Sequence, residues 1–218
     1  MPPTKWMRTW PEYHPDWTYD IFGNDYLQNT TFETQKQINE YMRRGNYAGV
    51  ADLMRYEILY ERGGFLAEAD SVCKKAIDEL FNDEHNIYTV YENEFVRGQL
   101  VSPILAAEPG HPFLRGLIDE LKRIPPEKLD IPWKQTGNLF VAQMIKEHQP
   151  HIRIWPSHYF IPEHYTGVKY QGMGTVYAEQ RFGTTNKSYR APNRVTKIME
   201  WYRKKYRKML KKRAKRSV

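Results

Sequence analysis

Residues 51–70 read ADLMRYEILYERGGFLAEAD: a helical pattern, two glycines, and a short apolar run that leads into two acidic residues. Apolar residues recur at helical spacing through the first part, which predicts an amphipathic helix from about residue 46 to residue 62. Its apolar face consists of Val50, Leu53, Met54, Ile58 and Leu59. Gly63 follows the last periodic residue and is expected to end the helix in a left-handed conformation.

The run after the glycines, residues 65–67, is short and apolar, which predicts a buried strand. Side chains alternate along a strand, so Glu68 and Asp70 are expected to leave its end on the same side. Two carboxylates at one point repel each other, and a hard divalent cation such as Mg²⁺ or Mn²⁺ offsets that repulsion while binding diphosphate oxygens. We therefore predict a divalent-metal site at Glu68 and Asp70.

The spacing of these residues resembles a known motif. Asp52-x-x-Arg55, a double glycine and then Glu68-x-Asp70 are similar to the DXD sugar-binding region of family 32 glycosyltransferases and their bacterial-toxin relatives. The resemblance implies a metal-dependent enzyme of the GT-A fold. It also implies that Asp52 and Arg55 contact hydroxyls of the donor sugar, that Asp70 ligates the metal, and that Glu68 lies near the ribose and a metal-bound water. Glu68 departs from the family pattern, which has Asp at this position.

Each part of the motif has an ordinary structural interpretation as well. An acidic pair at a strand end is usually a solvated terminus, and an Asp and an Arg three residues apart are most often a surface ion pair on a helix. The combination of spacings is much more specific than either pair. We therefore favour the donor-sugar interpretation.

Residues 176–189 fall where the relatives carry a strand and a loop near the metal and the diphosphate. Gln180 takes the place of a family His, and the resemblance implies that both Gln180 and Lys187 bind the donor. A cation at Lys187 would stabilise charge on the departing phosphate. A polar loop beside a basic segment would look the same without any ligand, so both interpretations stay open.

Three more segments carry predictions. Residues 18–22 resemble the second strand of the family, and they are predicted to form a strand. His111 precedes a predicted helix over residues 113–121, which indicates a structural role. Thr136 and Gly137 are expected to border the acceptor cleft, with Asn138 as the N-cap of the next helix. The remaining histidines match no recognised zinc signature, so no zinc site is predicted.

The chain has 218 residues, which is enough for one compact domain with a real core. The predicted fold class is α/β, a GT-A-like (Rossmann-related) mixed sheet flanked by helices in residues 1–193. A basic C-terminal helix is predicted in residues 194–218, which contain twelve Lys or Arg and one Glu. Because the whole chain carries +7, the first 193 residues carry a net charge of −4.

Three roles for the basic segment stay open. It can pack on the domain as a final helix with a solvated end, which we favour, or be attracted to an anionic membrane surface. Binding to nucleic acid is the least favoured, because the acidic domain offers no second basic face, and no specific nucleic acid is expected.

Other features indicate location. Cys73 is the only cysteine, which excludes an intramolecular disulfide and fits a reducing compartment. The sequence shows no signal peptide and no apolar run long enough to span a bilayer, so a cytoplasmic protein is expected. The size and the basic end are also similar to N-terminal transferase domains of multidomain chlorovirus glycosyltransferases, which implies transfer to capsid glycans in the host cytoplasm.

The hypothesis from the sequence is a hexosyltransferase that uses Mn²⁺ or Mg²⁺. It would move a hexose or deoxyhexose from a nucleoside-diphosphate sugar, such as UDP-glucose, to an oligosaccharide or glycoprotein acceptor with retention of configuration. Two alternatives stay open: a catalytically weak module that binds sugar nucleotides, and an adaptor that binds a membrane or nucleic acid through the basic segment.

Overall fold

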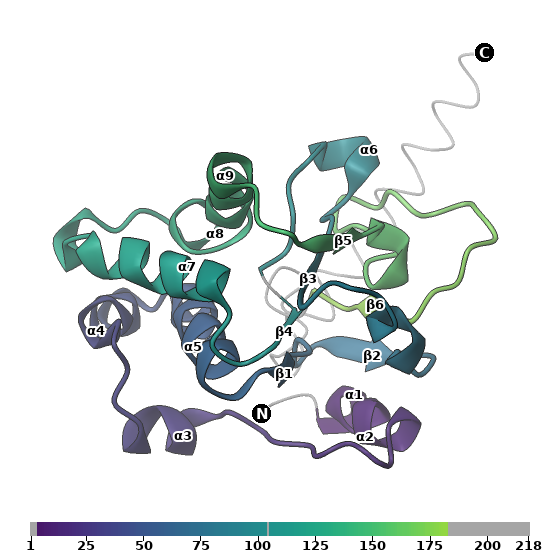
Figure 1. The fold of residues 1–218 in the computed structure, drawn as a ribbon, viewed down its shortest axis with the longest axis horizontal. Coiled ribbons are helices and arrows are strands. Elements are labelled where there is room, and N and C mark those ends of the chain that lie inside the picture. Colours follow the sequence, from purple (N-terminus) through teal and green to yellow (C-terminus); the bar gives the residue numbers. More distant parts are fainter. Residues whose placement is uncertain (1–3, 104, 183–218) are drawn as a thin grey trace, which may run out of the picture.

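A computed structural model describes residues 4–103 and 105–182, which form a mixed α/β fold (Figure 1). The α-helices are α1 (Thr4–Met7), α2 (Thr9–Tyr13), α3 (Asn24–Asn29), α4 (Gln35–Arg44), α5 (Tyr47–Arg62), α6 (Glu94–Arg97), α7 (Pro112–Arg123), α8 (Pro132–Gln135) and α9 (Asn138–His148). The strands are β1 (Gly64–Phe65), β2 (Ser71–Cys73), β3 (Ile87–Val90), β4 (Ala106–Ala107), β5 (Arg153–Trp155) and β6 (Ala178–Gln180). Short 3₁₀ helices are η1 (Asp78–Phe81), η2 (Pro126–Lys128) and η3 (Ser157–Tyr159).

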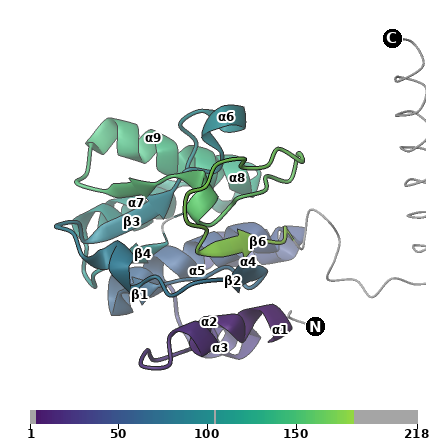
Figure 2. The same cartoon turned by 90° about the vertical axis from the view of Figure 1, so that its right-hand side faces the viewer.

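The strands form a four-stranded sheet in the order β1-β4-β3-β5 and a separate pair, β2-β6. Strand β4 is antiparallel to β1 and β3, whereas β5 runs parallel to β3. The parallel pair requires a long connection, which here contains α7, α8 and α9. Figure 2 shows α9 and α6 on one side of the strands and α1, α2 and α3 on the other. This mixed sheet flanked by helices confirms the predicted α/β fold class and is consistent with the GT-A-like fold.

The larger sheet separates two hydrophobic clusters because its side chains alternate. Ile87 on β3 packs with residues of α4, α5, α7 and α9, whereas the next residue, Tyr88, packs on the opposite face with Trp155 and Phe160. Strand β4 is divided in the same way, with Ala107 in the first cluster and Ala106 in the second. The first cluster therefore packs α4, α5, α7 and α9 against the sheet, and the second packs the part of the molecule that contains β2 and β6 against its other face.

Helix α5 confirms the helix predicted from the sequence. It packs against α4, α7 and α8, and all five residues of its predicted apolar face are buried: Val50, Leu53, Met54, Ile58 and Leu59. The helix ends at Gly63 as expected, with φ of 67°. Its ψ of −160° lies outside the left-handed helical region, in backbone space that only glycine readily adopts. The central helix is thus positioned by its apolar face and stopped by a glycine.

Two strand predictions are wrong. Residues 18–22 form no strand: they have no ladder partner in the described part of the chain, and Ile21 is 63% exposed. A short segment with neither a paired backbone nor a buried face gains nothing from the strand conformation. The strand predicted over residues 65–67 is β1, which ends at Phe65, and a turn follows in which Ser71 N donates to Glu68 O at 3.0 Å. Glu68 and Asp70 therefore lie in a turn and not at a strand end.

Three predictions concern residues that the structure does not describe or test. Lys187 and the basic segment 194–218 lie outside the described residues, and the division of the chain at residue 193 stays a prediction. Among the helices of residues 4–103 and 105–182, none combines the length and the apolar character needed to cross a membrane.

We expect Gly63→Ala to lower the free energy of unfolding by about 2–4 kcal/mol, because of backbone strain and a clash. An added Cβ would lie 2.6 Å from Pro109 Cδ and 3.0 Å from Ala107 O. Urea unfolding followed by circular dichroism measures the change. Gly116→Ala on α7 is the control, because an added Cβ there would contact nothing within 4 Å. This variant should be about 1 kcal/mol more stable than the unaltered protein. Equal stabilities for the two variants would contradict the assigned backbone conformation.

Candidate functional site

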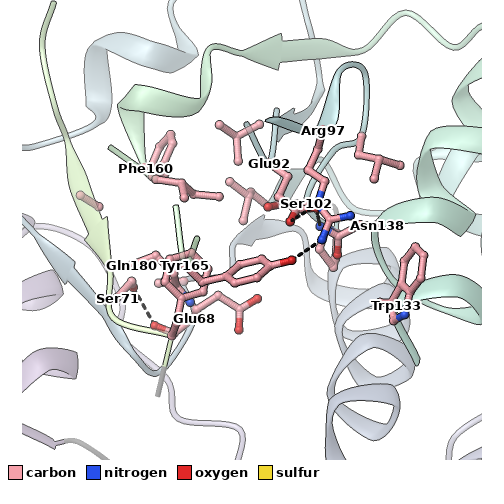
Figure 3. Close-up of a pocket in the computed structure, with 18 of the residues that line it drawn as sticks. Glu68, Ser71, Glu92, Arg97, Ser102, Trp133, Asn138, Phe160, Tyr165 and Gln180 are labelled. Atoms are coloured by element: carbon pink, nitrogen blue, oxygen red, sulfur yellow. Dashed lines mark hydrogen bonds and ion pairs between the residues drawn. The ribbon is translucent and has the colours of Figure 1, made fainter. Parts of the chain in front are cut away.

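A cavity of about 540 Å³ lies between the larger sheet and the β2-β6 pair. Its apolar wall is made mainly by Trp10, Phe65, Val90, Leu105, Phe160 and Ile161. Polar side chains lie on two sides of it (Figure 3), with Glu68, Ser71 and Gln180 on one side and Glu92, Arg97 and Asn138 on the other. A largely apolar cavity with a few converging polar groups is the usual form of a small-molecule site.

Arg55 connects the central helix to this cavity. Its side chain projects from α5 and is only 7% exposed, and Nη1 donates to Leu66 O at 3.2 Å. Nη2 forms an ion pair and a hydrogen bond with the carboxylate of Glu68, whose side chain is 41% exposed. A buried guanidinium requires such partners, so the pair holds Glu68 at the cavity wall.

Asp70 and Gln180 are brought together by strand pairing, although 110 positions separate them in the sequence. The register of β2 and β6 sets Ser71 opposite Gln180, and Gln180 Nε2 donates to Asp70 Oδ1 at 2.7 Å. Gln180 lines the cavity, whereas Asp70 is 7% exposed and lies behind the wall. The structure therefore joins two predicted site residues. Glu68 pairs with Arg55 and Asp70 accepts from Gln180; the convergence of the two carboxylates on one metal ion stays a prediction.

Asp52 lies one helical turn before Arg55 and contacts a different segment. Its Oδ2 accepts a hydrogen bond from Thr136 Oγ1 at 2.8 Å, and a Cβ on Gly137 would lie 3.2 Å from the same oxygen. The pKa of Asp52 is raised to about 7, mainly by burial and slightly by Glu68, while Arg55 and the Thr136 hydrogen bond oppose the rise. Asp52 is therefore a carboxyl group that changes charge near neutral pH.

Several residues of the cavity were not found from the sequence, and one was misassigned. Asn138 does not cap α9, because Gly137 occupies that position; its Nδ2 instead donates to Glu92 Oε2 at 2.9 Å. Arg97 and Tyr165 carry no motif of their own, and they meet Glu92 only through the fold. By contrast, His111 confirms its structural role, because its Nδ1 accepts from Phe113 N at the start of α7.

The predicted divalent-metal site can be tested against the oxygen ligands that Glu68 and Asp70 offer at the turn. Within the described residues, no group of three or more His, Cys, Asp or Glu side chains is placed to hold a metal ion. A magnesium site at a diphosphate needs only one or two carboxylates, since phosphate oxygens and water supply the rest. Glu68 and Asp70 offer the oxygen ligands that Mg²⁺ and Mn²⁺ prefer. The residues therefore fit a cation that is held mainly by the phosphates of a ligand.

Comparison with known proteins finds a similarity in one part of the chain. Residues 4–87 match the family model described as "Glycosyltransferase sugar-binding region containing DXD motif", and this range contains Asp52, Arg55, Glu68 and Asp70. A solved structure titled "PaToxG Glycosyltransferase" aligns at 16% identity and a TM-score of 0.44. The alignment covers 59% of this chain and 46% of the other, so this chain spans less than half of that structure's length. Among curated proteins, no sequence matches.

We expect the free energy of unfolding contributed by Asp52 to fall as the pH rises from about 4 to about 7. The folded protein retains a proton on this carboxyl up to about pH 7, whereas the ordinary pKa of an Asp side chain is 3.8, so the native state binds more protons in that window. Asp52→Asn should remove this dependence and raise stability at pH 8 by on the order of 1 kcal/mol. Urea unfolding at a series of pH values measures it.

The exposed Asp20 provides the matched control, since Asp20→Asn should leave the pH profile of stability unchanged. A parallel downward slope in Asp52→Asn and in the unaltered protein would contradict the raised pKa.

Proposed function

We propose that this protein is a metal-dependent glycosyltransferase that moves a hexose or deoxyhexose from a UDP-sugar to a glycan acceptor, an oligosaccharide or a glycoprotein. One observation carries the proposal: the segment that matches a glycosyltransferase sugar-binding region supplies Arg55 and Glu68, which pair at the wall of a cavity large enough for a nucleotide sugar. Gln180, which donates to Asp70, lines the same cavity, and the sequence resemblance implies that it binds the donor.

The residues divide the work according to their chemistry. Asp52 in its ionised form accepts hydrogen bonds from hydroxyls of the donor sugar, and Arg55 donates to oxygens of the same sugar. Glu68 is held in place by Arg55, and Gln180 holds Asp70. Both acids are therefore already ordered, and binding the donor costs them little conformational entropy. When bound at these acids, Mg²⁺ or Mn²⁺ would neutralise the diphosphate and make it a better leaving group.

The stereochemical proposal is retention by front-face transfer. No residue of the described cavity is assigned as a covalent nucleophile. The departing phosphate is proposed to assist the incoming acceptor hydroxyl on the same face of the sugar.

A catalytically weak sugar-nucleotide module is the second candidate, and the Arg55–Glu68 pair favours it. Glu68 stands where the motif has Asp, and its carboxylate is already engaged by a guanidinium. Such a module would bind UDP with a metal but would not release UDP from a UDP-sugar.

Calorimetric titration with UDP should show binding that depends on Mn²⁺, and Asp70→Ala should weaken that binding by about tenfold or more, as loss of metal ligation does. Asp20→Ala removes an exposed carboxylate outside the cavity and should bind as the unaltered protein does. The donor site is wrong if Asp70→Ala leaves the affinity unchanged, or if UDP binds equally well without metal. Metal-dependent binding of UDP-glucose without any UDP release would select the weak module.

Anomeric analysis of the product by NMR tests the stereochemistry. An α-linked UDP-sugar should give an α-linked product, because front-face transfer keeps the configuration at the anomeric carbon. A β-linked product would show inversion and would require a general base on the opposite face.

A further inference from the structure

The side of the cavity opposite Glu68 and Gln180 contains a second cluster of polar and aromatic side chains, which we call the Glu92 subsite. It consists of Glu92, Arg97, Trp133, Asn138 and Tyr165, and Figure 3 shows the Tyr165 side chain reaching from beside Gln180 toward Arg97. All five lie outside residues 4–87, the segment that matches the sugar-binding region. The two sides of the cavity therefore come from different parts of the chain.

Glu92 is the central group of this subsite, and it is held from behind. Its Oε1 lies 3.0 Å from Nε2 of the fully buried His164, and its Oε2 accepts from Asn138 Nδ2 at 2.9 Å. His164 is fixed in turn by Thr166, whose Oγ1 lies 2.7 Å from His164 Nδ1. Each carboxylate oxygen can accept two hydrogen bonds, so a pre-oriented carboxylate retains capacity for two donors from the cavity. Two neighbouring hydroxyls of a sugar ring are such donors.

Two partly exposed aromatic rings line the same cavity as this carboxylate. Trp133 is 46% exposed and Tyr165 is 40% exposed, although both line the cavity. Arg97 fixes the Tyr165 ring, because it donates to the phenolic oxygen and its guanidinium carbon lies 5.8 Å from the ring centroid. Rigid, partly exposed rings offer apolar faces to C–H groups while the polar groups beside them bind hydroxyls. The subsite thus combines the two kinds of contact that a sugar ring can make.

The charges indicate a neutral ligand. Arg97 Nε lies 3.8 Å from Glu92 Oε1, and Arg55 pairs with Glu68 across the cavity. Lys134, next to Trp133, lies 3.6 Å from Asp130. Arg97 and Lys134, the cations at this end of the cavity, are thus each matched by an acid, which leaves no excess positive charge for a phosphate group at this end. An uncharged, hydroxyl-rich group fits these walls better.

We propose that the Glu92 subsite binds an uncharged sugar ring of the acceptor, with Glu92 accepting hydrogen bonds from two of its hydroxyls and Trp133 packing on its C–H face. The assignment of this ring to the acceptor rests on the proposed function. Binding of a neutral sugar at this end of the cavity rests on the geometry of the five residues alone.

The test is a titration of the full chain with methyl glycosides of glucose, galactose, mannose and xylose, with and without UDP and Mn²⁺. The signals of the six tryptophan indole N–H groups are followed by ¹⁵N NMR, and Trp133→Phe assigns the signal of Trp133. At least one glycoside should shift this signal. Glu92→Gln should weaken that glycoside by about tenfold, because a hydrogen bond to a charged acceptor is lost. Glucose 6-phosphate should bind no better than the neutral glycosides.

Matched variants keep the result interpretable. Phe95→Ala removes an aromatic residue that is 82% exposed and does not line the cavity, so it should bind glycosides as the unaltered protein does. Trp133→Leu alters an exposed side chain, and calorimetry should show weaker glycoside binding even if Glu92→Gln fails to fold. The subsite is wrong if no glycoside shifts the Trp133 signal, if both Glu92→Gln and Trp133→Leu bind normally, or if the phosphorylated sugar binds more tightly.

UDP binding in the same samples separates the two proposals. Glycoside binding at Trp133 without any UDP binding would contradict the proposed donor function but would support the sugar-binding subsite. UDP binding without a response at Trp133 would contradict the subsite alone.

Discussion

The pairing of the buried Arg55 guanidinium with Glu68 is the interaction on which the cavity depends. Helix α5 is positioned by its apolar face against α4 and α7, so Arg55 has little freedom to move toward solvent. Removing a charge from water is costly unless hydrogen bonds and an opposite charge replace the water. The carbonyl of Leu66 and the carboxylate of Glu68 meet this need, and they draw the segment after β1 onto the helix. The cavity wall therefore follows from the packing of α5.

The cavity is closed by segments that are distant in the sequence. The β2-β6 pair joins the turn after β1 to residues 178–180, and Trp10 Nε1 donates to Ser71 Oγ at 2.9 Å to hold α2 against the same turn. On the other side, Glu92 ties the end of β3 to the start of α9 and to His164. Each wall thus depends on a few long-range hydrogen bonds between groups that are largely removed from water, where such bonds are most effective.

The two acids around Arg55 show how the local environment gives chemically similar side chains different charge behaviour. Glu68 contacts the guanidinium directly and remains partly exposed, whereas the carboxyl of Asp52 faces Thr136 and has a pKa raised to about 7 by burial. A carboxyl that ionises near neutrality and a carboxylate held by a cation respond differently to pH and to an arriving sugar. The side of the cavity that contains Glu68, which the proposed function assigns to the donor, is therefore expected to be sensitive to pH through Asp52.

Local pattern and spacing were enough to predict the helix of α5, its end at Gly63 and the structural role of His111 at the start of α7. These features depend on neighbours within a few positions, so their physical causes are visible in the chain itself. The strand expected over residues 18–22, the directions of Glu68 and Asp70, and the Glu92 subsite were decided by tertiary structure. A strand requires a paired strand, a buried charge requires an opposite charge or hydrogen bonds, and a cavity requires residues on both of its sides. In each of these cases the partner residues lie far away in the sequence.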